Sequence, residues 1–233
     1  MKLGKRLHSI ASLAAHRGPM ADIGTDHAYL PIYLVQQGCI PRAIAVEVNE
    51  GPFNAAKEMI NAFGLTDKID LRFGNGLEPL RPGEASTIAI AGMGGSTMID
   101  ILTDRPEVTS SAKLIVLQPM TASAALRRWL VGNSWRIIDE DLVLDEGRLY
   151  EIIAAEQGAS ETIEDILFEI GPILWSKRPE HLLLHIEQLI VSMQRVLEEM
   201  NRSAKAVQTH KYQELKDRIQ TLEEKRKCLL GAI

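Results

Sequence analysis

The 233-residue sequence predicts an α/β fold with a mostly parallel sheet, followed by a C-terminal helical hairpin of coiled-coil type. Short apolar runs alternate with helix-like segments as far as residue 131, which indicates repeated strand–helix units. Beyond residue 157 the strand signals stop, and apolar residues recur at intervals of three and four. We therefore expect two domains, residues 1–158 and 159–233.

The segment 19–29 predicts a ligand-binding turn. It begins as a short apolar strand, turns at Gly24 and continues into a helix-like run. A glycine turn between a strand and a helix presents backbone N–H groups and the positive end of a helix dipole to a ligand. Glu47 ends the next apolar strand, about 20 residues later, where a carboxylate can bind both hydroxyls of a ribose. A solvated strand end is the alternative for Glu47.

The glycine pattern departs from a dinucleotide fingerprint, because Asp26 and Ala28 stand where the second and third glycines would be. A carboxylate at Asp26 would repel a pyrophosphate on the turn. It suits a ligand with cationic groups, such as the amine and sulfonium of S-adenosylmethionine. The alternative for Asp26 is the N-cap of the following helix, and the two roles are compatible.

The remaining elements of the first domain follow in order. An amphipathic helix precedes the first strand, and further strands are expected at 42–48, 68–73, 85–91 and 113–117, with helices between and after them. Strand-like runs at 135–144 and 148–155 flank Asp145-Glu146-Gly147, a hairpin turn signal. A parallel sheet that ends in an antiparallel hairpin is typical of methyltransferase sheets, whereas dehydrogenase sheets more often continue with strand–helix units.

Composition favours a cytoplasmic protein. The sequence has no apolar run of membrane-spanning length, no signal-peptide pattern, and two cysteines that suggest neither a disulfide framework nor a metal site. The net charge of −5 gives no global attraction to nucleic acid. Residues 1–21 are locally basic and contain no acidic residue; their cations are Lys2, Lys5, Arg6 and Arg17, with His8 and His16. The alternative is a packing helix whose charges face water.

The second domain predicts two long helices that reverse near residues 201–209. The seam comprises Leu182, Ile186, Leu189, Met193, Val196 and Met200, then Leu215, Ile219, Leu222 and Leu229. Basic residues near the reversal would allow contacts to an RNA backbone: Arg202, Lys205, Lys211, Lys216 and Arg218. A dimerising or purely structural coiled coil is the alternative, and the oligomeric state is left open.

Five unusual loops follow the predicted strands and are expected to converge on one cleft, because the carboxyl ends of parallel strands share an edge. They are 24–28, 47–49, 74–76, 92–95 and 118–120. Asn75 can hydrogen-bond an adenine edge, although Gly74-Asn75-Gly76 also suits a plain turn. The segment 92–95 offers backbone surface to an acceptor base, with a tight strand–helix connection as the alternative.

Four motifs together resemble the bacterial tRNA (adenine-N1)-methyltransferases of the TrmK family. They are ADIGTDHAYLP at 21–31, GNGL at 74–77, IAGMGG at 90–95 and LQPM at 117–120. The resemblance covers nearly the whole chain, and implies a class I methyltransferase Rossmann-like fold with seven strands, the last antiparallel, and a helical coiled-coil domain. It also implies S-adenosylmethionine as the methyl donor and adenine 22 in the D-arm of tRNA as the acceptor.

Asp26 is the expected catalytic residue, holding the donor amine or accepting a hydrogen bond from adenine N6. His27 and Tyr29 are expected to hydrogen-bond or stack, with a buried or capping role as the alternative for His27. The residues expected at the donor site are Gly24, Asp26, His27, Glu47, Val48, Asn49, Asn75, Gly76, Ala91, Gly92 and Met93. The residues expected at the substrate are Tyr29, Gly94, Gly95, Gln118, Pro119 and Met120.

No metal is expected at the site.

Two other functions would use the same sequence signals. An NAD-dependent oxidoreductase would also use Gly24 and Glu47, but Asp26 and the terminal hairpin disfavour it. A non-catalytic RNA-binding module could retain a vestigial donor site.

Overall fold

A computed structural model describes residues 1–15 and 17–231. The chain divides into two compact units, Met1–Glu161 and Thr162–Ile233, where the sequence predicts a boundary after residue 158. Each unit is described here by itself. His16, one of the predicted basic-patch residues, lies outside the described residues.

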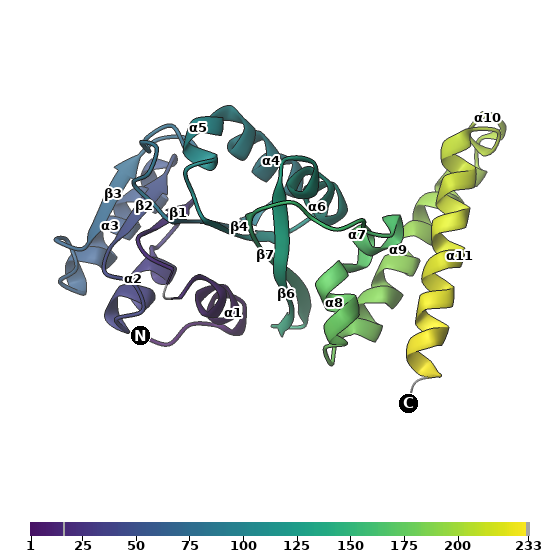
Figure 1. Cartoon of the computed structure of the whole chain (residues 1–233), viewed down its shortest axis with the longest axis horizontal. Helices are drawn as coiled ribbons and strands as arrows, with labels where there is room; N and C mark the ends of the chain where they lie inside the picture. The colour runs from purple at the N-terminus through teal and green to yellow at the C-terminus, as the bar shows by residue number, and fades with distance from the viewer. Residues whose placement is uncertain (16, 232–233) are drawn as a thin grey trace. The chain divides into compact units, whose positions relative to one another are not determined.

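The first unit is built on a seven-stranded sheet, which confirms the predicted fold class (Figure 1). The spatial order is β3-β2-β1-β4-β5-β7-β6, and β7 runs antiparallel to both β5 and β6. The strands are β1 (Met20–Ile23), β2 (Ala43–Glu47), β3 (Ile69–Phe73), β4 (Thr87–Met93), β5 (Leu114–Pro119), β6 (Trp135–Asp145) and β7 (Arg148–Gln157).

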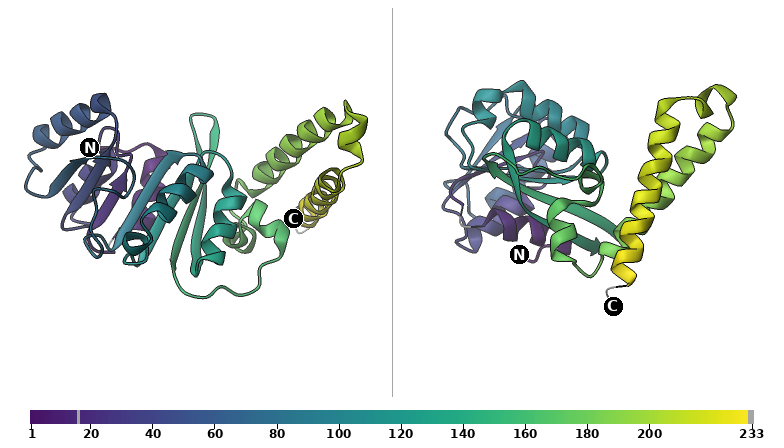
Figure 2. Two further views of the ribbon diagram at one scale, coloured as in Figure 1. Left: turned by 90° about the horizontal axis from the view of Figure 1, so that it is seen from above. Right: turned by 45° about the vertical axis from the view of Figure 1, so that its right-hand side comes forward.

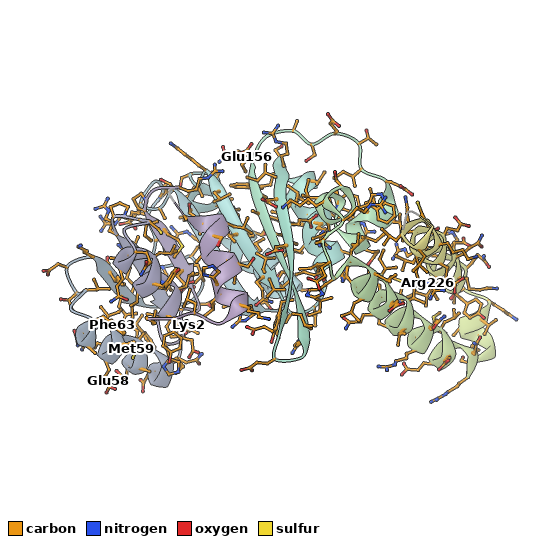
Figure 3. All side chains as sticks on the ribbon, turned by 90° about the horizontal axis from the view of Figure 1, so that it is seen from below. Lys2, Glu58, Met59, Phe63, Glu156 and Arg226 are labelled. Carbon is orange, nitrogen blue, oxygen red and sulfur yellow. The ribbon has the colours of Figure 1, made fainter. Side chains whose placement is uncertain are left out.

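Helices cover both faces of the sheet, which explains why the inner strands are almost continuously apolar. Helices α1 (Lys5–Ala14), α2 (Tyr29–Gln36) and α3 (Glu50–Ala62) lie on one face; α4 (Gly95–Asp104), α5 (Pro106–Thr109) and α6 (Ser123–Gly132) lie on the other (Figure 1). Every residue of β1, β2 and β5 is buried. Met59 on α3, and Phe63 at the end of that helix, pack one turn apart against the core (Figure 3).

The second unit is helical, and α9 (Leu182–Asn201) and α11 (His210–Leu230) lie side by side as an antiparallel hairpin (Figure 2). The short helices α7 (Asp165–Ile170), α8 (Pro172–Lys177) and α10 (Ala204–Val207) complete it, and α10 occupies the predicted reversal. Ile186 and Leu222 are fully buried in the seam, but Val196 is 45% exposed, so the predicted seam is not closed along its whole length. Within the described ranges, no helix combines the length and apolar character needed to cross a membrane.

Candidate active site

A cavity of about 1210 Å³ lies at the carboxyl ends of the first four strands. It is centred where the strand order reverses, because β2 and β3 lie on one side of β1, and β5 lies beyond β4. Open α/β sheets bind ligands at this position. The sheet topology therefore brings together loops that are far apart in the sequence.

Gly24 forms the tight turn after β1. Its φ of +71° lies in the left-handed region that favours glycine, and its N–H and that of Thr25 donate to the Val46 carbonyl oxygen at 2.9 and 3.0 Å. A Cβ at this position would lie 2.2 Å from Cε of Met93. The Met93 side chain therefore packs against the bare turn, and a larger residue at position 24 would displace it.

Asp26 lies in a second turn, not at a helix cap. Helix α2 begins at Tyr29 and its N-cap is Ala28, so the N-cap alternative for Asp26 is wrong. The chain makes left-handed turns at Asp26 (φ 53°) and Ala28 (φ 56°), which delay the helix by about half a turn. The Asp26 side chain is 66% exposed, lines the cavity, and lies 3.7 Å from Nε2 of His27.

His27 and Tyr29 form a stacked pair at the cavity wall. Their ring centroids are 5.3 Å apart and the rings are inclined by 15°. Both residues line the cavity, and His27 neither caps a helix nor is buried. The alternative of a buried or capping His27 is therefore wrong, and the pair presents a flat aromatic surface to a ligand.

Glu47 is buried and hydrogen-bonded, so the alternative of a solvated strand end is wrong. The residue is 5% exposed. Oε1 accepts from the backbone N–H groups of Val48 and Asn49, both at 2.9 Å, and from Asn49 Nδ2 at 3.1 Å. Oε2 accepts from the Asp26 N–H at 3.2 Å and retains capacity for a further donor, such as a ribose hydroxyl. One carboxylate thus ties the β2 loop to the β1 turn.

Asp22, which the sequence analysis missed, lies beneath this site. It is buried in β1, and Thr25 Oγ1 donates to it at 2.6 Å. Burial raises its pKa to about 6, the Thr25 hydrogen bond opposes this rise, and the charge of Glu47 adds to it. The signal for Asp22 was a carboxylate within an otherwise apolar strand.

We expect Asp22→Asn to remove a pH-dependent part of the stability. Because the native pKa lies above the unfolded value, the folded state binds more protons between pH 4 and 6, and stability falls as pH rises through that window. From pH 4 to pH 7 the unfolding free energy of the variant should gain about 2 kcal/mol relative to the unsubstituted protein. Denaturant unfolding across this range measures the difference; a constant difference would contradict it.

All eleven predicted donor residues line the cavity, as does Tyr29. The other five predicted substrate residues, Gly94, Gly95, Gln118, Pro119 and Met120, are not among its lining residues. Substrate contact by these five stays a prediction.

Two of those five have a clear packing role. A Cβ at Gly95 would lie 2.7 Å from the Ala122 carbonyl oxygen, so this glycine permits close approach of α4 and the loop before α6. Gln118 is fully buried, and its Oε1 accepts from the Gly92 N–H at 3.2 Å and from Arg6 Nη1 at 2.6 Å. Gln118 therefore fixes two residues that line the cavity, and Gly95 allows the close packing of α4 beside it.

The sequence analysis also missed both ends of the cavity. The N-terminal segment contributes Met1, Lys2, Leu3, Gly4, Arg6 and Leu7, and α4 contributes Thr97, Asp100, Ile101 and Asp104. No local pattern places an amphipathic helix over the carboxyl edge of a sheet, because that placement depends on tertiary packing. Elsewhere in the predicted basic patch, His8 contacts Tyr33 edge-on at 6.1 Å.

Comparison with known proteins decides the family. The family model described as TrmK, tRNA (adenine(22)-N(1))-methyltransferase, matches residues 20–224. The chain belongs to the TrmK family. The tRNA (adenine(22)-N(1))-methyltransferase of Bacillus subtilis is 35% identical over 230 residues, which cover 96% of this chain and 97% of the relative.

Solved structures agree with the TrmK assignment. A Streptococcus pneumoniae protein in complex with S-adenosyl-L-methionine superposes with a TM-score of 0.86 at 32% identity, over 97% of this chain and 100% of that one. M. capricolum TrmK, in complex with S-adenosyl-homocysteine, gives a TM-score of 0.82 at 28% identity, over 97% of this chain and 99% of that one.

Proposed function

We propose that this protein transfers a methyl group from S-adenosylmethionine to N1 of adenine 22 in the D-arm of tRNA. The observation that carries the proposal is the Glu47 carboxylate, which is buried at the end of β2 and bonded to the Asp26 backbone of the Gly24 turn. Family membership supports the same reaction. A tRNA substrate also fits the cytoplasmic location that the sequence predicts.

The residues at the cavity fit this donor. The Gly24 turn lines the cavity, and Glu47 Oε2 can accept from a ribose hydroxyl. Asn75 lines the cavity and can bond an adenine edge, while the carboxylates of Asp22 and Asp26 favour a cationic amine and sulfonium. A pocket for one small ligand is about 300–1,000 Å³, so a cavity of about 1210 Å³ has room for a donor and an acceptor base.

The bound donor would supply an electrophilic methyl group. Neutral adenine N1 carries no proton and has an in-plane lone pair, so a new N1–carbon bond can form while the carbon–sulfur bond breaks, without a general base. The positive charge passes to the adenine, and the carboxylate of Asp26 stabilises it. The protein's contribution is therefore alignment and a negative electrostatic environment.

The stacked pair of His27 and Tyr29 would hold the acceptor base. A base reaches a methyltransferase cleft only after leaving its helical stack, and aromatic side chains replace that stacking. Tyr29 is 38% exposed, so its ring remains accessible. Within residues 1–15 and 17–231, no group of three or more His, Cys, Asp or Glu side chains is arranged to hold a metal ion.

Methyl transfer to unmodified tRNA tests the proposed function. Purified protein is incubated with labelled S-adenosylmethionine and bulk tRNA, and the digested RNA should contain labelled 1-methyladenosine. Binding of the donor without any transfer would favour the non-catalytic RNA-binding module. Thermal stabilisation by NAD and not by S-adenosylmethionine would favour the oxidoreductase.

The second unit offers basic residues for tRNA. Arg202, Lys205 and Lys211 are exposed near the turn between α9 and α11. Arg218, which the sequence analysis grouped with them, instead pairs with Glu169 at 3.5 Å and Asp165 at 3.9 Å. The first three are therefore the better candidates for phosphate contacts.

We expect replacement of Arg202, Lys205 and Lys211 by Ala to weaken tRNA binding and to reduce the salt dependence. Loss of three phosphate contacts lowers the slope of log K against log salt by up to about 3. The affinity for S-adenosylmethionine should not change. A triple variant at exposed Lys57, Lys68 and Lys113 removes the same charge from the first unit and serves as control. Equal slopes for both triple variants would leave the hairpin as a structural or dimerising element.

A further inference from the structure

The cavity has opposite charges at its two sides. Six carboxylates line it: Asp22, Asp26, Glu47, Glu78, Asp100 and Asp104. The lysine and arginine side chains that line it are those of Lys2 and Arg6, both from the N-terminal segment. A cationic donor is suited by the carboxylates. Arg6 therefore suits an anionic group, either the carboxylate of the donor's methionine part or a phosphate of the acceptor strand, and the donor-affinity measurement below distinguishes the two.

Arg6 is held in place by three strands. Its backbone N–H donates to Asp145 Oδ2 at 3.1 Å, so a carboxylate at the end of β6 satisfies a free N–H group in the first turn of α1. Its Nη1 donates to the buried Gln118 of β5 at 2.6 Å. Its guanidinium carbon lies 5.5 Å from the ring centroid of Tyr150 on β7. The side chain is thus positioned before any ligand binds.

The guanidinium keeps hydrogen-bond donors available. Of its five N–H groups, the Nη1 contact to Gln118 satisfies one, and the described residues provide no partner for Nε or Nη2. A Cβ at Gly92 would lie 3.8 Å from Nη1 of Arg6. The guanidinium therefore lies against the bare backbone of segment 92–95, which the sequence predicts to face the acceptor base. Free guanidinium donors in a fixed plane match a phosphate.

A second arginine lies near the same tyrosine ring. The guanidinium carbon of Arg148, at the start of β7, also lies 5.5 Å from the Tyr150 ring centroid. Among the described residues, neither Arg6 nor Arg148 forms an ion pair. The nearby Asp145 carboxylate accepts the Arg6 backbone N–H instead. Tyr150 therefore contacts two cations that form no ion pair with the described residues.

We propose that Arg6 and Arg148, which both contact the ring of Tyr150, form a phosphodiester-binding subsite for the RNA strand that carries the acceptor base. Arg6 would bind the phosphate next to the target adenosine, and Arg148 a neighbouring phosphate. This inference rests on the proposed function, since it assumes an RNA acceptor. It makes Arg6 a positioning residue that places the nucleotide beside Gly92.

The test compares Arg6→Ala, Arg6→Lys and Arg148→Ala with Arg42→Ala. Arg42 is exposed before β2, which lies on the other side of the sheet from β5, β7 and β6, and is a matched control. For each variant we would measure tRNA binding against salt concentration, kcat and KM for tRNA, and S-adenosylmethionine affinity by calorimetry. The binding measurement needs no turnover. If the wild-type protein binds tRNA but transfers no methyl group, the proposed function is refuted, and the binding data for the variants still test the subsite.

We expect Arg6→Ala to lower kcat/KM for tRNA by about 10- to 100-fold, the scale for loss of a charge-assisted hydrogen bond. Its salt slope should fall by about 1, and so should that of Arg148→Ala. Arg6→Lys should lie between Ala and wild type, and Arg42→Ala should match wild type. Donor affinity should stay within about twofold of wild type in every variant.

Unchanged salt slopes for Arg6→Ala and Arg148→Ala would overturn the subsite, and so would a wild-type protein that binds no tRNA. A parallel loss of S-adenosylmethionine affinity in Arg6→Ala would overturn it too, by assigning Arg6 to the donor. Arg148→Ala decides the matter if Arg6→Ala does not fold, because Arg148 is exposed at the hairpin.

Discussion

Asp26→Asn is expected to reduce methyl transfer by about 10²–10³-fold, the scale for removing one group that stabilises charge in a reacting site. The substitution removes the negative charge that lines the cavity beside His27. The fold should be retained, because the side chain is 66% exposed and Asn tolerates the left-handed φ of 53°. Single-turnover transfer to tRNA measures the effect on the chemical step.

Asp67→Asn is the control for this substitution, because Asp67 is exposed before β3 at the far edge of the sheet. It removes the same charge and should transfer at the wild-type rate. Normal turnover by Asp26→Asn would reject the charge-based role of Asp26. Equal losses in both variants would point to an effect of net charge.

Glu47→Ala is expected to weaken S-adenosylmethionine binding by about 1–3 kcal/mol, which is the scale for lost charge-assisted hydrogen bonds. Part of the loss comes from the ribose, and part from the backbone N–H groups of Asp26, Val48 and Asn49, which lose their acceptor. Glu47→Gln should also weaken binding, because its amide cannot accept from all these donors at once.

Isothermal titration with S-adenosylmethionine and with S-adenosylhomocysteine measures the Glu47 effect. Both ligands carry the ribose, so both affinities should fall together. Unchanged affinity for both would remove Glu47 from the donor site. A loss confined to S-adenosylmethionine would indicate that Glu47 acts on the sulfonium charge instead of the ribose.

The sequence predicted those parts of the site that depend on local chain geometry. The turn at Gly24 and the strand end at Glu47 are marked by a glycine and a carboxylate that follow apolar runs. Both lie at the cavity, where the sequence pattern placed them. Convergence of four of the five predicted loops followed from parallel strands sharing one edge, whereas the loop 118–120 does not line the cavity. The hairpin of β6 and β7 followed from its turn residues.

Other features depended on packing between distant segments. The N-cap of α2 is Ala28, not Asp26, because the turn before the helix is longer than the sequence pattern indicates. Arg6 lines the cavity and donates a hydrogen bond to Gln118, 112 residues away in the sequence. Gly95 was predicted to offer backbone surface to the acceptor base, and the close approach of Ala122 gives it a packing role that the sequence did not show. Such contacts have no local signature.

The most direct test of the proposed reaction uses two tRNA transcripts that differ only in carrying adenine or guanine at position 22. Both are incubated with the protein and methyl-labelled S-adenosylmethionine, and the label is mapped by digestion and mass spectrometry. The account predicts one methyl group on N1 of adenine 22 and no labelling of the guanine transcript. Equal labelling of the two transcripts, or labelling of neither while the donor binds, would contradict it.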